Sequence, residues 1–282
     1  MLKIAVTATP SEARGAPILL RGDLASAFRQ AAECGCQGVE LLLRRAEDVD
    51  AGAVRRLIAD YGLGVPTLGT GMAATQDGLM LADPRAEVRA QALERLRGHI
   101  GLAAEVGAAV TIGSLSGKLG PGQDEERRSR RATALACLAE VCGLAARAGV
   151  TVLLEPLNRY ESDYINTLAD GMAVAAETGA ANLKLLADTF HMNIEEKDLA
   201  ASLIAAGALV GHVHLADTNR RAPGHGHLNV AGVLQALAQI GYHGYLSFEV
   251  LPLPDPVRAI RDGVAAIHAA LSGQVNRKEL EP

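Results

Sequence analysis

The sequence predicts an α/β protein that folds as a (β/α)8 TIM barrel, in a single domain over residues 1–282. Short β-branched or Leu-rich runs alternate along the chain with longer Ala-rich amphipathic segments, eight of each. Such alternation is typical of strand–helix units around a parallel sheet. The length of 282 residues suits a closed barrel, and no Gly-, Ser- or Pro-rich linker divides the chain. We therefore expect a closed barrel in preference to an open sheet.

Each expected strand is an apolar run, because a strand of a parallel barrel is covered on both faces. In chain order the strands are 2–8 (LKIAVTA), 38–43 (GVELLL), 64–69 (GVPTLG), 109–113 (AVTIG), 150–155 (VTVLLE), 183–188 (LKLLAD), 209–215 (LVGHVHL) and 244–250 (GYLSFEV). The longest loops, 69–80 and 113–123, both follow strands. Barrel enzymes build their sites from such loops.

Each expected helix is an Ala-rich amphipathic segment that follows one of these strands. The helices lie near 23–35, 51–61, 84–106, 124–148, 167–179, 196–206, 230–240 and 255–271. Four polar residues at helix starts are capping candidates, because their side chains can accept the free backbone N–H groups of a first turn. They are Asp23, Asp83, Thr167 and Asn229.

Composition and charge exclude several kinds of partner. The net charge is −5, from 27 basic and 32 acidic residues, which argues against nucleic acid. Five Tyr, three Phe and no Trp are too few for base-stacking platforms. No apolar run approaches the ~20 residues of a membrane span, and the opening MLKIAVTATPSE is typical of a first strand, not of a secretory signal. We expect a cytoplasmic protein with reduced, packed cysteines.

Polar residues stand at or near the carboxyl ends of the last four expected strands. They are Glu155, Asp188, His214 and Glu249, each from a different strand–helix unit. Any one of them could simply cap a helix or form an ion pair. Three carboxylates crowded on one rim repel, however, and their burial costs several kcal/mol unless a cation compensates. Oxygen ligands with one imidazole predict a single divalent metal ion, Mn²⁺, Mg²⁺ or Co²⁺.

Four histidines crowd the segment GHVHLADTNRRAPGHGHLN at 211–229. His212 and His214 point to the same face of their strand, because side chains alternate with period two. His214 lies nearer the rim and is the better metal ligand, whereas His212 is either a hydrogen-bonded group one layer deeper or a second ligand. His225 and His227 follow Pro-Gly in a loop and are expected to face solvent or the edge of a substrate.

Several longer strings resemble a known family. They are LLEPLNRYESD (153–163), LADTFHMNIEE (186–196), GHVHLADTNRRAPGHG (211–226) and IGYHGYLSFEV (240–250), with a weaker match at GTGMAATQDGL (69–79). These strings resemble the sugar isomerase and epimerase branch of the xylose-isomerase-like TIM barrels. Within that branch they are similar to D-tagatose and D-allulose 3-epimerases, and more closely to 5-keto-L-gluconate epimerase.

The resemblance implies that the four strand-end residues bind one divalent metal ion, usually Mn²⁺. It also implies that Glu155 and Glu249 act as acid and base, and that Glu161, His191 and Arg220 contact the sugar oxygens. The expected enzyme is an isomerase of the carbohydrate-epimerase type acting on a small sugar or sugar acid. We also expect a homo-oligomer, either a dimer or a tetramer.

The expected reaction is epimerisation beside a ketone through a cis-enediolate, with two glutamates on separated strands. The 3-epimerases of free ketohexoses line their pockets with aromatic residues, including the Trp that this chain lacks. That difference disfavours a free hexulose. The resemblance to 5-keto-L-gluconate epimerase implies a keto-acid sugar such as 5-keto-L-gluconate or D-tagaturonate, with Lys118 or Arg221 as candidate partners of its carboxylate, unless Lys118 is an ordinary solvated loop lysine. A free-ketohexose 3-epimerase remains an alternative.

Three further alternatives share this fold. An aldose–ketose isomerase, such as a hydroxypyruvate isomerase, would use the same metal and carboxylates but move the proton to the adjacent carbon. An apurinic-site endonuclease would need extra zinc ligands after the third and fourth strands, where this chain reads GTG and GSLSG. A non-enzymatic sugar-binding barrel is the third, and the presence of both Glu155 and Glu249 argues against it.

Overall fold

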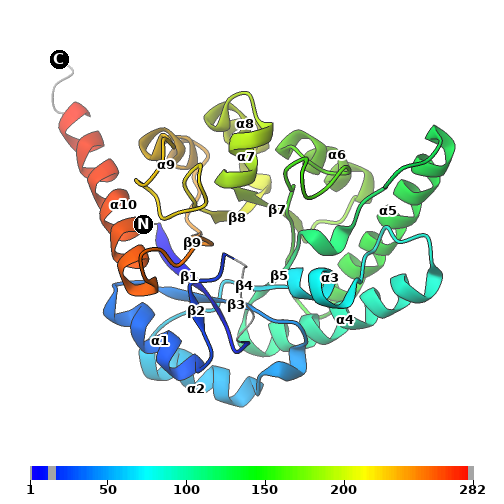
Figure 1. The fold of residues 1–282 in the computed structure, drawn as a ribbon, viewed down its shortest axis with the longest axis horizontal. Coiled ribbons are helices and arrows are strands. Elements are labelled where there is room, and N and C mark those ends of the chain that lie inside the picture. Colours follow the sequence, from blue (N-terminus) through cyan, green and yellow to red (C-terminus); the bar gives the residue numbers. More distant parts are fainter. Residues whose placement is uncertain (1, 12–16, 279–282) are drawn as a thin grey trace.

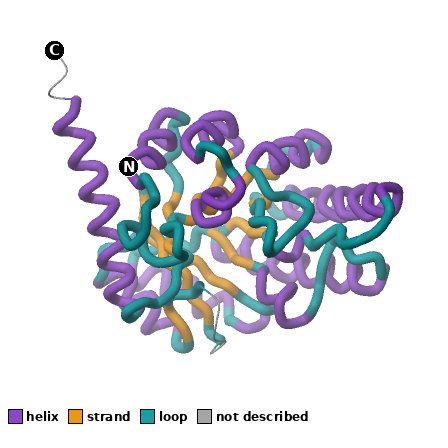
Figure 2. Tube along the Cα trace, turned by 45° about the horizontal axis from the view of Figure 1, so that its top comes forward, coloured by secondary structure: helices purple, strands orange, loops and turns teal. Residues whose placement is uncertain are grey.

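Eight parallel strands close into a barrel in the computed structural model, which describes residues 2–11 and 17–278. The hydrogen-bonded order is β2-β1-β3-β4-β5-β6-β7-β8-β9, and the additional pairing of β1 with β9 closes the ring. Helices surround the strands (Figure 1), and the strands lie at the centre when the molecule is tilted (Figure 2). The predicted (β/α)8 fold is confirmed.

All eight predicted strands are present, most of them with shorter ends than predicted. They are β1 (Lys3–Thr9), β3 (Gly38–Leu42), β4 (Thr67–Gly69), β5 (Ala109–Ile112), β6 (Val152–Leu154), β7 (Leu183–Asp188), β8 (Val210–His214) and β9 (Tyr245–Phe248). One extra strand, β2 (Leu20–Arg21), pairs with the end of β1. Two residues are too few to show a strand period in the sequence.

All eight predicted helices are present as well. They are α1 (Leu24–Glu33), α2 (Ala51–Tyr61), α4 (Ala86–Val106), α5 (Asp124–Arg147), α6 (Leu168–Thr178), α8 (Leu199–Ala206), α9 (Val230–Gln239) and α10 (Pro256–Lys278). The structure adds two short helices outside the predicted helical segments, α3 (Gly71–Asp77), within a predicted loop, and α7 (Thr189–Glu195). It also adds three 3₁₀ turns, η1 (Ala46–Asp48), η2 (Ser114–Ser116) and η3 (Gly207–Leu209). Both short helices follow barrel strands at the rim.

Three of the four predicted helix caps are confirmed. The side chains of Asp23, Thr167 and Asn229 accept backbone N–H groups in the first turns of α1, α6 and α9. The prediction for Asp83 is wrong, because α4 begins after Arg85, which caps it without a side-chain hydrogen bond. Asp83 instead accepts the backbone N–H and the guanidinium of Arg85 ahead of the helix.

The two faces of the barrel strands differ in polarity. Val6, Val39 and Val152 are fully buried on the outward face, under the surrounding helices, whereas Glu40, His212 and Ser247 are buried inside the barrel, where His212 contacts both of the others. Cysteines occur only as free thiols in the described part of the chain, mostly buried. Within residues 2–11 and 17–278, none of the helices combines the length and the apolar composition needed to cross a membrane.

Candidate active site

The carboxyl ends of β6, β7, β8 and β9 bring four potential metal ligands together. Asp188 and His214 are the last residues of β7 and β8, while Glu155 and Glu249 directly follow β6 and β9. One ligand atom from each residue lies within 4.8 Å of the others. Parallel strands of a barrel all end at the same rim, so residues far apart in sequence meet there.

His214 turns one ring nitrogen toward the three carboxylates. Its Nδ1 lies 3.5 Å from Oε1 of Glu155, 3.4 Å from Oδ2 of Asp188 and 3.5 Å from Oε2 of Glu249. This Nδ1 is buried and makes no hydrogen bond within the described residues. A buried polar atom without a partner is costly, and a divalent cation bound among these four residues would satisfy it. The donor set of three carboxylates and one imidazole therefore fits a hard divalent ion.

The charges of the site act strongly on one another. Burial opposes protonation of His214, but the negative charges of Glu40 and Glu249 outweigh it and raise the pKa of His214 well above its usual value. Burial also opposes ionisation of Asp188, but the positive charge of Arg220 outweighs it and lowers the pKa of that carboxyl. A proton and a metal ion compete for the same imidazole lone pair. The negative field that favours the proton also favours a cation.

Glu155 sits against the backbone of the neighbouring strand end. Burial is the main cause that raises its pKa, and the charge of Glu249 adds to the rise. Gly113 follows β5, and a Cβ atom at that position would overlap Oε2 of Glu155. Only glycine leaves room for this carboxylate to lie where it does.

The loop after β8 brings a guanidinium to the ligand cluster. Arg220 Nη1 donates to Oδ2 of Asp188 at 2.6 Å, and its Nη2 donates to Glu249. The guanidinium also stacks on the ring of Phe190, 4.7 Å from the centroid. The backbone of Arg220 has a φ of 60°, which is uncommon for a residue other than glycine.

The buried carboxylate of Asp217 holds that loop in shape. It accepts backbone N–H groups from Thr218, Gly224 and Leu228 at 2.8–3.0 Å. The backbone N–H of Arg220 in turn donates to the carbonyl of Asp217. The unusual backbone conformation of Arg220 is thus supported by hydrogen bonds on both sides of it.

His191 and Glu161 lie on the same rim, joined by Asn158. Nδ1 of His191 accepts the backbone N–H of Asn158 at 3.3 Å and its side-chain amide at 2.7 Å. The neutral ring therefore carries its proton on Nε2, which lies 3.8 Å from Oδ2 of Asp188. The amide of Asn158 also donates to Oε1 of Glu161, whose side chain is 49% exposed. Both residues remain available to a ligand.

A cavity of about 670 Å³ opens above the ligand cluster. Its lining contains every predicted site residue except Asp188, which lies fully buried beneath. The opposite wall consists mainly of small and apolar residues on the other strands and on the segments beside them, together with Glu40 and Gln76. Its described lining residues there include Ile18, Leu42, Gly69, Thr70, Met72, Thr111, Gly113 and Ser114.

The remaining histidines of the 211–229 segment do not join the strand-end cluster. His212 lies one layer below, where its Nε2 is 3.0 Å from both Oε2 of Glu40 and Oγ of Ser247. His225 pairs with Asp262 at 3.0 Å, and His227 pairs with the hydroxyl of Thr218. Neither loop histidine lines the cavity.

The two candidate partners for a substrate carboxylate also lie away from the cavity. Lys118 is exposed and Arg221 is half-buried, and neither contributes to the described lining. Arg220 is the cation that the described lining residues provide, and it is already paired with two carboxylates.

Three functional candidates were missed by sequence reasoning. Glu40 stands in an expected strand, and a charged residue inside an apolar run was the signal that could have revealed it. Asn158 and Asp217 lie in loops, where polar residues are ordinary and nothing in their spacing marks them. The role of Asn158 depends on its contact with His191, 33 positions away, and that of Asp217 depends on how its own loop folds back onto the carboxylate.

Fold and site define a class: a (β/α)8 barrel with a candidate metal centre at the carboxyl ends of its strands. The chain belongs to the xylose isomerase-like TIM barrel family, whose model matches residues 28–269. The predicted resemblance to sugar epimerases of this family is confirmed.

Two curated relatives and one solved structure illustrate the similarity. The chain is 36% identical to L-ribulose 3-epimerase of Mesorhizobium japonicum over 217 residues, covering 77% of this chain and 72% of that protein. It is 34% identical to 3-dehydro-D-guloside 4-epimerase of Escherichia coli over 252 residues, covering 84% and 91%. A solved L-ribulose 3-epimerase superposes with a TM-score of 0.84, at 29% identity over 99% of this chain and 98% of that one. The chain is accordingly an enzyme of the isomerase class, of the epimerase type.

Proposed function

We propose that the chain is a divalent-metal-dependent epimerase that inverts C3 of a small keto-sugar. The observation that carries the proposal is the unpartnered Nδ1 of His214, which faces three carboxylates at the floor of the cavity. Glu155, Asp188, His214 and Glu249 would hold the ion, with Mn²⁺ as the first choice and Co²⁺ or Mg²⁺ as alternatives. When bound, the ion would supply Lewis-acid stabilisation of the charge that develops on the sugar oxygens.

Glu155 and Glu249 are the proposed acid and base. They follow β6 and β9, which are separated in the ring by β7 and β8, so they approach a sugar from different sides. One carboxylate removes the proton from C3, and the electron pair spreads over C3, C2 and the C2 oxygen as a cis-enediolate. The other carboxyl, in its protonated form, returns a proton to the opposite face of C3. Exchange with solvent then restores the starting protonation of both groups.

Three other rim residues are proposed to orient the sugar. Nε2–H of His191 and the guanidinium of Arg220 present donors beside the ligand cluster, which suits carbonyl and hydroxyl oxygens. Glu161 presents an acceptor at the open side of the cavity. Hydrogen bonds of this kind fix the reacting carbon between the two glutamates.

We propose a neutral keto-sugar in preference to a keto-acid sugar. Arg220 is the cation of the described cavity lining, and Asp188 and Glu249 already pair with it. A substrate carboxylate would enter a cavity lined by Glu40, Glu155, Glu161 and Glu249. Like charges within one cavity repel, so the described lining disfavours a substrate that carries a carboxylate. The names of the relatives, L-ribulose 3-epimerase among them, are consistent with a neutral ketose.

Solvent exchange in deuterated water tests the proposal. With Mn²⁺ present, L-ribulose or D-allulose should give its C3 epimer with deuterium at C3. Deuterium at C2 of an aldose product, and at C1 of the recovered ketose, would instead indicate an aldose–ketose isomerase. A higher kcat/KM for D-tagaturonate or 5-keto-L-gluconate than for any neutral ketose would contradict the neutral-substrate assignment. Full activity in a verified metal-free preparation would contradict the metal.

A further inference from the structure

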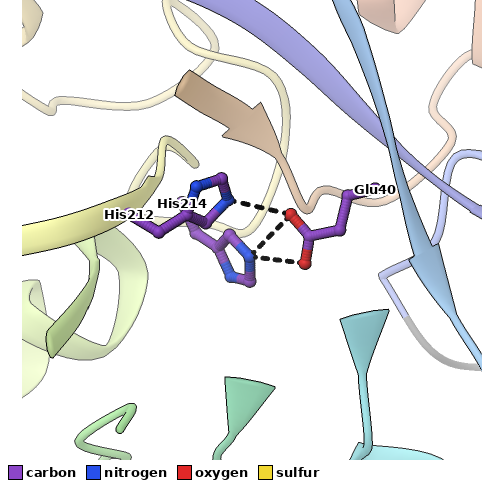
Figure 3. Close-up of side chains that lie close together, drawn as sticks. All are labelled: Glu40, His212 and His214. Atoms are coloured by element: carbon purple, nitrogen blue, oxygen red, sulfur yellow. Dashed lines mark hydrogen bonds and ion pairs between the residues drawn. The ribbon is translucent and has the colours of Figure 1, made fainter. Parts of the chain in front are cut away.

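The carboxylate of Glu40 lies in the barrel interior directly beneath the proposed metal ligands. It belongs to β3, whose remaining residues are all apolar, and it is 1% exposed. Its Oε1 lies 3.0 Å from Nε2 of His214, and its Oε2 lies 3.0 Å from Nε2 of His212 (Figure 3). One residue from the first part of the barrel therefore accepts hydrogen bonds from both histidines of β8.

This contact decides which nitrogen of His214 carries a proton. A neutral imidazole has one N–H donor and one lone pair. Because Glu40 in its ionised form only accepts hydrogen bonds, Nε2 of His214 must be the donor. The lone pair is then on Nδ1, the atom that faces Glu155, Asp188 and Glu249 without a hydrogen bond of its own.

We propose that Glu40 is a positioning residue for the metal centre: it holds His214 as the Nε2–H tautomer, with Nδ1 aimed at the ion. This inference rests on the proposed function, since it assigns Glu40 a purpose only if the strand-end cluster binds a metal. A carboxylate behind a metal-binding histidine also makes the ring a stronger donor, and losing such a partner typically weakens metal binding.

His212 completes the arrangement by holding Glu40 in place. The two imidazole rings meet edge to face, with centroids 5.4 Å apart, and each uses its Nε2 to reach the same carboxylate. Nε2 of His212 is also 3.0 Å from the hydroxyl of Ser247. Without His212, one side of the carboxylate would lose its donor and Glu40 would be free to turn away from His214.

The same three residues could in principle bind a second metal ion, because their ligand atoms lie close together. The distances of 3.0 Å from each Nε2 to the carboxylate are those of ordinary hydrogen bonds. If these contacts are hydrogen bonds, both Nε2 atoms and both carboxylate oxygens have partners. Nδ1 of His214 has none. The unsatisfied atom thus points to a single ion, on the other side of the ring.

Metal binding by Glu40→Gln tests the proposal without relying on turnover. A glutamine has nearly the same shape, but it carries no negative charge and its amide nitrogen donates, so one of the two acceptor oxygens beside the imidazoles is lost and the other is weaker. We expect the variant to fold, to bind Mn²⁺ about 10–100-fold more weakly than the wild type, and to show a changed Co²⁺ absorption spectrum. Ser247→Ala is the matched control, because it alters the same buried layer and leaves both histidine contacts to Glu40. It should bind Mn²⁺, and separately Co²⁺, as the wild type does.

The outcomes separate this inference from the proposed function. A wild-type chain that binds no divalent ion would overturn both. Wild-type affinity and an unchanged Co²⁺ spectrum in Glu40→Gln would overturn only the role of Glu40. Two ions per wild-type chain, reduced to one in the variant, would make Glu40 a ligand and overturn the positioning role as well.

A measurement on the wild type covers the case in which Glu40→Gln does not fold. Nitrogen-15 NMR of the Zn²⁺-loaded protein, with His214 assigned by comparison with His212→Gln, reports which ring nitrogen carries hydrogen. The expected result is a proton on Nε2 of His214. A proton on Nδ1 would overturn the proposal.

Discussion

The two halves of the barrel rim differ in what their strands deliver to the cavity. The ends of β6 to β9 supply charged groups, namely Glu155, Asp188, His214 and Glu249. The ends of β4 and β5 supply Gly69 and Gly113, with threonines and apolar side chains around them. On the proposed function the charged half would carry the chemistry, and the other half gives the cavity its shape and leaves room for the charged half to assemble.

Glu40 is the exception that connects the halves. It comes from β3, yet its carboxylate reaches His212 and His214 on β8. The division is thus clear at the rim and breaks down one layer below it. Four experiments measure how far the division holds, and they are ordered from the largest expected effect to the smallest.

Removing a proposed metal ligand should give the largest loss. His214→Ala or Asp188→Asn should lose the bound ion and with it several kcal/mol of transition-state stabilisation, or roughly 10³-fold or more in kcat/KM. Metal content by atomic spectroscopy and epimerisation rate check this together. Retention of both in either variant would show that the charged half does not form one metal centre.

Glu249→Gln should impair proton transfer while keeping the fold. Positioned general acid–base groups contribute roughly 10²–10⁴-fold, so we expect a loss of that size in kcat. The residue is assigned both roles, so metal affinity is measured in the same variant and activity is compared at saturating Mn²⁺. Near-normal turnover would remove Glu249 from the mechanism.

Gly113→Ala tests whether the shaping half matters to the charged half. The new methyl group would displace the carboxylate of Glu155, and a misplacement of about 1 Å can cost 10²-fold in rate. We expect reduced kcat and weaker Mn²⁺ binding. Gly71→Ala is the control, because a Cβ there meets no atom within 4 Å, and its metal affinity should stay at the wild-type value. Equal behaviour of the two variants would contradict the role of Gly113.

The loop histidines should give the smallest effects. His225→Ala removes a partly exposed pair with Asp262, and His227→Ala removes a contact with Thr218. Such pairs contribute about 1 kcal/mol or less to stability, and neither histidine lines the cavity. Thermal unfolding and metal content should change little. A loss of metal comparable with that of His214→Ala would extend the charged site into the loop.

The sequence predicted the barrel well because strand and helix periods repeat eight times in a regular order. The elements that it missed, β2, α3 and α7, are short and lie at the rim. Two to seven residues do not establish a period. The cap at Asp83 was misplaced for a related reason. Its side chain accepts the backbone N–H of Arg85 ahead of the helix instead of an N–H of the first helical turn, and the sequence pattern does not distinguish these two donors.

A site residue could be predicted when its signal lies in the adjacent sequence, and not when its role depends on contacts with distant positions. The proposed strand-end ligands were visible because charge interrupts apolar runs at regular places. Glu40 interrupts such a run as well, but its meaning comes from contacts with β8, more than 170 positions away. Lys118 illustrates the reverse: a glycine-rich rim loop suggested a ligand contact, and the structure directs that lysine to solvent.

The buried Asp217 has a consequence for how tightly a sugar can be held. Its carboxylate already fixes backbone groups of Thr218, Gly224 and Leu228, and the loop that carries Arg220 is therefore ordered before any ligand arrives. Ordering a loop on binding costs conformational entropy that is subtracted from affinity. Here that cost is met during folding, so the contacts proposed between Arg220 and a sugar would contribute to binding without a further loss of loop entropy.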